Sequence, residues 1–165
     1  MSKRFPHPFS AMAGRYRAYW RTLPTAVSAL AAADFRSNFR RQGVRTSKSA
    51  VDKWKPRQGG KDPGRALLIS SGRLRRGIRP APLGSVARVI NTVPYAAIHN
   101  RGGSMRGQMR AASTNLRTRL QRLRRSGHAA QMPARPFMVT TDPLIDEVRA
   151  HIMEGLNKVF NVPSS

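Results

Sequence analysis

The chain has 165 residues, no cysteine and a formal charge of +24 at pH 7. Its length suits one domain with extensions and a sizeable core. The missing cysteines exclude a disulfide framework and thiolate chemistry. No apolar run reaches the roughly 18 residues of a membrane helix, and residues 6–8, Pro-His-Pro, interrupt the place where a signal peptide would be apolar. We therefore expect a soluble protein, intracellular when it is made, with no membrane partner.

The charge is distributed unevenly. Residues 63–141 contain fifteen arginines but no lysine, aspartate or glutamate. Such a region cannot neutralise itself, so its partner is expected to be a polyanion or the acidic surface of a neighbouring protein. Arginine binds phosphate and carboxylate equally well, so residue type does not choose between them. Four of the seven acids lie between Asp142 and Glu154, which makes the C-terminal segment mildly acidic.

Residues 1–21 are interpreted as a basic N-terminal arm that is rich in aromatic side chains. These rings can stack on bases or pack on the body or a neighbouring subunit, and packing is the preferred interpretation. A helix is predicted to follow, with Thr22 or Thr25 as its cap, Pro24 in its first turn and Gly43 as its stop. Its buried face is expected to contain Val27, Leu30, Ala31, Asp34, Phe35, Asn38 and Phe39.

Residues 44–64 are polar and rich in lysine, glycine and proline, and are predicted to form a loop that Trp54 anchors to the core. Residues 65–71 are an apolar run that suits one or two helical turns. Residues 74–79 and 86–91 are predicted to be paired strands, because their β-branched content is high and prolines lie between them. One helical turn is expected over residues 95–99.

Residues 101–130 are an arginine-rich insertion. Within it, leucines at 116, 120 and 123 predict a weak helix with a narrow apolar stripe. Residues 137–140 are predicted to be a third strand. The closing helix should begin at Thr141 or Asp142 and bury Ile145, Val148, Ile152, Leu156 and Val159.

These elements predict an α+β fold in which a small antiparallel sheet packs against the N-terminal and C-terminal helices. This domain is expected to span residues 22–165 and to contain the insertion of residues 101–130.

Catalysis has little support in the sequence. General acid–base chemistry commonly pairs a histidine with a carboxylate, or two carboxylates, and the central region has no carboxylate. The four histidines share no metal-ligand spacing, and no phosphate-binding glycine motif occurs. Ser70, Ser71 and Gly72 favour a turn over a nucleophile, and His99 favours a packing role. We expect no enzyme activity, cofactor or metal.

Four short motifs in a fixed order carry a resemblance. They are Trp54-Lys55-Pro56, then Leu67-Leu68 leading into Ser71-Gly72-Arg73-Leu74, then Tyr95 to Gly103 (YAAIHNRGG), and finally Met132 to Phe137 (MPARPF). In this order they resemble the virion morphogenesis proteins of tailed bacteriophages. That family includes the Mu-type morphogenesis protein G, the tail completion protein S of temperate myophages and lambdoid neck proteins. The resemblance covers about residues 30–160.

The resemblance implies a structural, non-enzymatic virion protein at the head–tail junction, assembled in the host bacterial cytoplasm. Its partners would be itself as a homo-oligomeric ring, the adjoining head-completion or connector and tail-tube or terminator proteins, and genomic DNA in the channel. The expected scaffold residues are Trp54, Gly72, Leu74, Tyr95, His99, Gly102, Pro133, Arg135, Pro136 and Phe137. Trp54, Tyr95 and Phe137 are expected in one core cluster, with Arg135 projecting from a rigid frame.

The candidates for DNA or partner contact lie in the insertion: Arg106, Arg110, Arg117, Arg119, Arg122, Arg124 and Arg125. The alternative function is a free basic protein that binds nucleic acid without sequence specificity. No sequence-reading motif appears, so a role in tracking the DNA backbone or lining a channel is favoured over base recognition.

Overall fold

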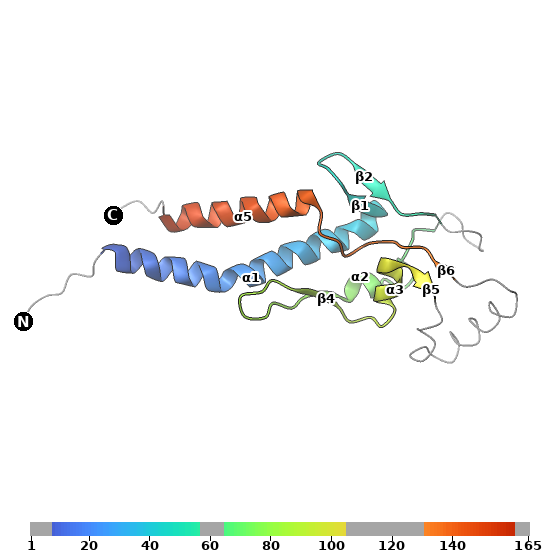
Figure 1. Ribbon diagram of the computed structural model, residues 1–165, viewed down its shortest axis with the longest axis horizontal. Coiled ribbons are helices and arrows are strands. Elements are labelled where there is room, and N and C mark those ends of the chain that lie inside the picture. Colours follow the sequence, from blue (N-terminus) through green and yellow to red (C-terminus); the bar gives the residue numbers. More distant parts are fainter. Residues whose placement is uncertain (1–7, 57–64, 105–130, 161–165) are drawn as a thin grey trace, which may run out of the picture.

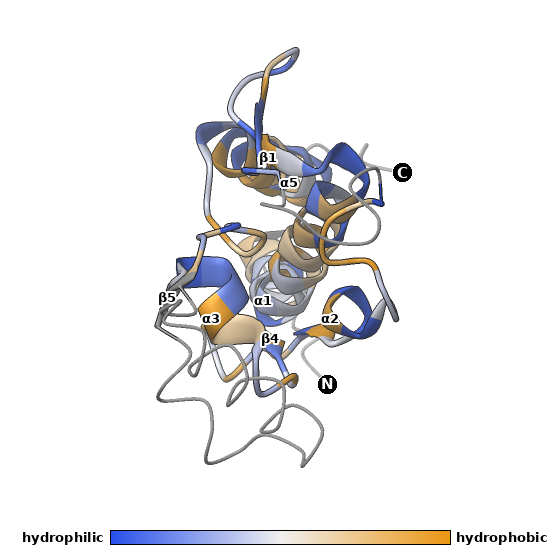
Figure 2. Ribbon diagram, turned by 90° about the vertical axis from the view of Figure 1, so that its right-hand side faces the viewer, coloured by the Kyte–Doolittle hydropathy of each residue, from blue (hydrophilic) through white to orange (hydrophobic). Residues whose placement is uncertain are grey.

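A long helix organises the molecule. The computed structural model describes residues 8–56, 65–104 and 131–160, and in these α1 (Pro8–Arg41) spans most of the length. The closing helix α5 (Asp142–Phe160) runs back along one side of α1. Figure 2, turned by 90°, shows α1 between α5 on one side and α2, α3 and β4 on the other. The α+β class is confirmed, but the expected single sheet is three separate two-stranded ribbons.

Helix α1 begins at Pro8, so the predicted start at Thr22 or Thr25 is wrong. Pro24 lies inside the helix, where it cannot donate a backbone hydrogen bond, and α1 changes direction along its length in Figure 1. On the N-terminal side of Pro24, α1 packs on α5, where the Tyr19 hydroxyl donates to the Ile152 carbonyl at 3.1 Å. The division of the chain at residue 21 stays a prediction, although α1 runs through it unbroken.

The predicted loop over residues 44–64 contains a ribbon that sequence reasoning missed. Strands β1 (Gly43–Arg45) and β2 (Val51–Lys53) pair antiparallel directly after α1. Helix α1 ends at Arg41, and the next residue, Gln42, turns the chain out of the helix with a φ of 54°. Gly43 is therefore the first strand residue and not the helix stop. A side chain at Gly43 would collide with the backbone of Asp52 across the ribbon.

The predicted hairpin is present with different boundaries. Residues 73–76 form a short helix, α2 (Arg73–Arg76), and only then do β3 (Ile78–Pro80) and β4 (Val89–Asn91) pair antiparallel. The expected helical turns over residues 65–71 are wrong, since turns and bends occur there. The expected helical turn near residue 95 is α3 (Ala96–Arg101). A last ribbon pairs β5 (Gly103–Ser104) with β6 (Gln131–Met132), so β5 lies inside the predicted insertion of residues 101–130 and β6 directly follows it.

No strand forms over residues 137–140, so the predicted third strand is wrong. The core nevertheless centres there. Phe39 and Phe137 are both fully buried, with ring centroids 5.1 Å apart, and Trp54 meets the Phe39 ring edge-on at 5.7 Å. Tyr95 packs against the same cluster, as the sequence predicts. On α5, Val159 is buried as expected, whereas the buried Leu144 was not foreseen.

Candidate functional site

The segment over residues 135–138, hereafter the strap, bends at Phe137 and Met138 as it passes through the core, and side chains hold it instead of a neighbouring strand. The Trp54 indole Nε1 donates to the Pro136 carbonyl at 2.8 Å. The buried Asn38 on α1 donates from Nδ2 to the Phe137 carbonyl at 3.2 Å. A buried backbone group without a partner is costly, so these bonds explain how the strap lies in the core without a strand partner.

Asn100 at the C-terminal end of α3 completes the pairing of the strap. Its Oδ1 accepts from the backbone N–H groups of Phe137 at 2.8 Å and Met138 at 2.9 Å, and its Nδ2 donates to the Met138 carbonyl at 3.3 Å. One residue earlier, the His99 carbonyl accepts from the Arg135 N–H at 2.9 Å. Asn100 therefore does for this segment what a β-ladder would do. It lies within a recognised motif, yet sequence reasoning gave it no role.

Tyr95 and His99 lie one helical turn apart, with their rings edge to face at 5.7 Å. His99 is half-buried, and its Nδ1 has no hydrogen-bond partner within the described residues. Burial, and secondarily the charge of Arg135, lowers the pKa of His99 below its ordinary value. The imidazole is therefore neutral at neutral pH, which suits packing.

Arg135 is buried, with 6% of its surface exposed, so the expectation that it projects outward is wrong. Its Nε donates to the Lys55 carbonyl at 3.2 Å, and a second nitrogen lies 3.8 Å from the Met132 sulfur. The guanidinium thus ties the strap to the segment after β2. Pro133 and Pro136 flank it in the chain and favour extended backbone.

Two glycines of the motifs have conformational reasons for their identity. Gly72 precedes α2 with a φ of 65°, and Leu74, two residues later, is buried. Gly102 ends α3 with a φ of 74°, and a Cβ there would lie 2.7 Å from the Ala134 nitrogen. Among the scaffold residues singled out from the sequence, Trp54, Leu74, Tyr95 and Phe137 lie in or against the core cluster, and His99 and Gly102 lie beside the strap or the residues just before it. We call this group the frame. A role of this frame in binding partners stays a prediction.

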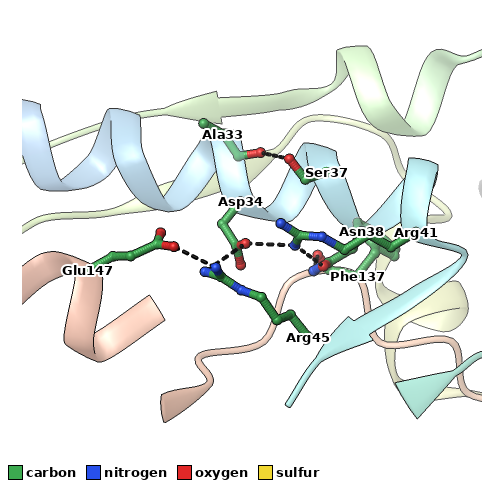
Figure 3. Close-up of polar contacts among 8 residues, drawn as sticks. All are labelled: Ala33, Asp34, Ser37, Asn38, Arg41, Arg45, Phe137 and Glu147. Atoms are coloured by element: carbon green, nitrogen blue, oxygen red, sulfur yellow. Dashed lines mark hydrogen bonds and ion pairs between the residues drawn. The ribbon is translucent and has the colours of Figure 1, made fainter. Parts of the chain in front are cut away.

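An ion-pair network joins α1, β1 and α5 (Figure 3). Buried Asp34 contacts Arg41 at 2.9 Å and Arg45 at 3.5 Å, and Arg45 continues to Glu147 on α5 at 2.6 Å. The hydrogen bond to Glu147 raises the pKa of Arg45 above its ordinary value, so the guanidinium stays protonated. Sequence reasoning placed Asp34 on the buried face of the helix, which is the signal that a buried partner was required.

The seven arginines predicted to contact DNA or partners lie between residues 106 and 125, outside the described residues.

An aromatic cluster, formed by Tyr16, Trp20 and Phe160, lies where the start of α1 meets the end of α5. Tyr16 stacks on Trp20 at 6.0 Å and contacts Phe160 at 6.4 Å. Trp20 and Phe160 are 50% and 51% exposed. The core does not cover this cluster.

In the part of the chain that the structure describes, no helix has the length and apolar character needed to cross a bilayer. Within the same residues, histidines and acids do not gather in groups of three that could hold a metal ion.

Comparison with known proteins gives one match. The model of the phage virion morphogenesis family matches residues 31–157, which is well over half of the chain and includes residues 31–41 of α1, the strap and residues 142–157 of α5. No curated protein and no solved structure matches the chain significantly. The family identified from the four sequence motifs is therefore confirmed. The chain belongs to the phage virion morphogenesis family and has a structural role in building the virion.

Proposed function

We propose that this protein is a non-enzymatic subunit of the head–tail junction of a tailed phage, in a neck, tail-terminator or tail-completion position. Identical copies close a ring around the DNA channel and join the head to the tail. Its neighbours are the head-completion or connector proteins on one side and the tail-tube or terminator proteins on the other. Genomic DNA passes through the ring without being read by sequence.

The aromatic cluster is the observation that carries this proposal. Soluble monomers rarely leave grouped large apolar side chains in water, and such groups commonly mark interfaces. Tryptophan and tyrosine are also the residue types that most often dominate interface energies. Tyr16, Trp20 and Phe160 lie at the end of the two-helix layer, where a neighbouring copy can cover them without disturbing the core.

Ring closure also has a symmetry argument. A surface that binds a different surface on the next identical copy generates a ring when the rotation closes. The two sides of α1 differ, since α5 covers one and the α2–β3–β4 group covers the other. A contact between one side of α1 in one copy and the other side of α1 in the next copy would therefore be heterologous, as a ring of this kind requires.

The test replaces Trp20 and Phe160 with serine in the full chain. Light scattering coupled to gel filtration measures the mass of the assembly, and circular dichroism checks the fold. We expect wild-type rings and a folded, unassembled double variant. In infected cells, the same variant should leave heads and tails unjoined.

The matched control replaces Leu83 and Val86 with serine at the tip of the β3–β4 ribbon. These side chains are 64% and 59% exposed, so the change removes a comparable apolar surface elsewhere. Rings should persist in the control. A wild-type monomer that binds DNA at physiological salt, together with normal particles from the Trp20 and Phe160 variant, would reject the proposal in favour of a free nucleic-acid-binding protein.

A further inference from the structure

A second group of arginines lies outside the insertion in the sequence, on elements that lie on the opposite side of α1 from α5 (Figure 2). It consists of five exposed arginines on α2, on β3 and just before β4, which we call the arginine face: Arg73, Arg75, Arg76, Arg79 and Arg88. None of the five makes an ion pair with any residue that the structure describes. The arginine face falls within residues 63–141, which contain no aspartate or glutamate, so neighbouring residues in the sequence do not balance its charge.

The pairing of β3 with β4 explains why these side chains point outward. Ile78 and Val89 lie on the face of the ribbon that packs against the core. Side chains alternate along a strand, and directly paired residues share a face. Arg79 pairs with Ile90, and the Ala81 N–H donates to the Arg88 carbonyl, so both arginines belong to the outer face.

Helix α2 extends this surface. Leu74 is its buried residue, whereas the other three positions are exposed arginines. Only Gly77 separates α2 from β3 in the chain. The short helix and the ribbon therefore present their arginines next to each other along the chain.

Two of the arginines are already held in place by backbone carbonyls. Arg76 donates to the Ser71 carbonyl at 2.7 Å, and Arg88 donates from Nε to the Ala81 carbonyl at 3.0 Å. A guanidinium has five N–H donors, so each keeps donors available for a ligand. Partial fixation lowers the entropy that binding must overcome.

The acids of a second copy are poorly placed to neutralise this face. On α5, Asp146 pairs with Arg149 and Glu154 pairs with Lys158, while Glu147 is occupied by Arg45. Among the described acids, only Asp52 and Asp142 make no ion pair. Double-stranded DNA, in contrast, presents one negative charge about every 1.7 Å along its axis, and guanidinium groups bind phosphate through paired hydrogen bonds.

We propose that the arginine face binds the phosphate backbone of double-stranded DNA without reading its sequence. A helix of four residues is too short to enter a groove and read base edges, so contact is restricted to phosphates. This inference rests on the proposed function for its setting, a ring that surrounds DNA. It places DNA contact on a rigid part of the domain, in addition to any contact that the insertion makes.

The experiment replaces all five arginines with glutamine in the full chain. Fluorescence anisotropy measures binding to a short labelled duplex of mixed sequence over a series of salt concentrations. Each phosphate contact contributes about −0.9 to the slope of log affinity against log salt, so loss of five contacts should reduce the slope by up to about 4.5. Two duplexes of different sequence should give the same result.

The matched control replaces five other exposed arginines on α1 and α5 with glutamine, which removes the same charge: Arg15, Arg17, Arg21, Arg40 and Arg149. We expect the control to keep most of the wild-type slope. Equal losses in both variants would show that only net charge matters, and an unchanged slope in the arginine-face variant would reject the site.

The same samples separate this inference from the proposed function. Light scattering reports ring formation independently of DNA affinity. One outcome is that the wild-type protein binds DNA without forming a ring, and that the arginine-face variant loses this binding. That outcome supports the DNA site and rejects the ring. An arginine-face variant that binds DNA normally but cannot form rings shows that these arginines face a protein neighbour, and the inference is wrong.

Discussion

Asn100→Ala removes the side chain that replaces a strand partner for the strap. Three hydrogen bonds disappear, and two backbone N–H groups, those of Phe137 and Met138, lose their acceptor. Phe137 is fully buried, so no water reaches its N–H without opening the core. Met138 is only partly buried, and water can satisfy its N–H at a lower cost.

The expected loss follows from these two donors. An unsatisfied buried polar group costs about 1–3 kcal/mol. With Phe137 near the upper end and Met138 near the lower end, the free energy of unfolding should fall by about 3–4 kcal/mol. This is a large part of a total stability of about 5–15 kcal/mol. For a domain of this size, the melting temperature should fall by roughly 6–15 °C.

Thermal and urea unfolding of the full chain, followed by circular dichroism, measures the change. Asn157→Ala on the exposed side of α5 is the matched control and should melt like wild type. Hydrogen exchange should also accelerate at the amides of Phe137 and Met138 in the Asn100 variant. If Asn100→Ala melts like the control and both amides stay protected, another group satisfies the strap and the reasoning is wrong.

Two further substitutions test the frame. Trp54→Ala should lower the free energy of unfolding by about 3–5 kcal/mol. Trp54→Phe loses mainly the hydrogen bond to the strap and should lower it by about 0.5–1.5 kcal/mol. Equal urea midpoints for the two variants would contradict the anchor role. His99 has a lowered pKa in the folded state, so its contribution to stability is complete above its ordinary pKa of 6.5 and is lost as the pH falls below that value. His99→Phe should therefore flatten the dependence of the urea midpoint on pH just below 6.5, and an unchanged dependence would assign the effect to other groups.

Local sequence pattern was sufficient for part of the fold. The closing helix was predicted because its apolar residues recur at helical spacing and its acids favour the N-terminal end. The hairpin of β3 and β4 was predicted because β-branched residues surround a segment rich in proline. Trp54 was identified as an anchor because a single tryptophan in a polar loop usually packs against the core and fixes the loop to it.

Some elements contradict their local signals. Pro24 is typical of a first helical turn, yet it lies inside α1, whose residues before the proline pack on α5 through Tyr19. Residues 74–76 form α2 although the prediction there was a strand. The ribbon of β1 and β2 has three residues per strand, too few for a clear alternation.

The sequence by itself determined the basic character of the chain, the identity of its core aromatics, its two terminal helices and its family. Only the tertiary structure decided how the strap is held and where the free arginines gather. The hydrogen bonds to the strap join partners that are far apart in the sequence. The separation is 99 positions for Asn38, 82 for Trp54, and 37 and 38 for the two bonds of Asn100. Such side-chain bonds to the backbone have no periodicity, because they depend on where the folded chain brings a donor and an acceptor together, and no pattern of neighbouring residues records that meeting.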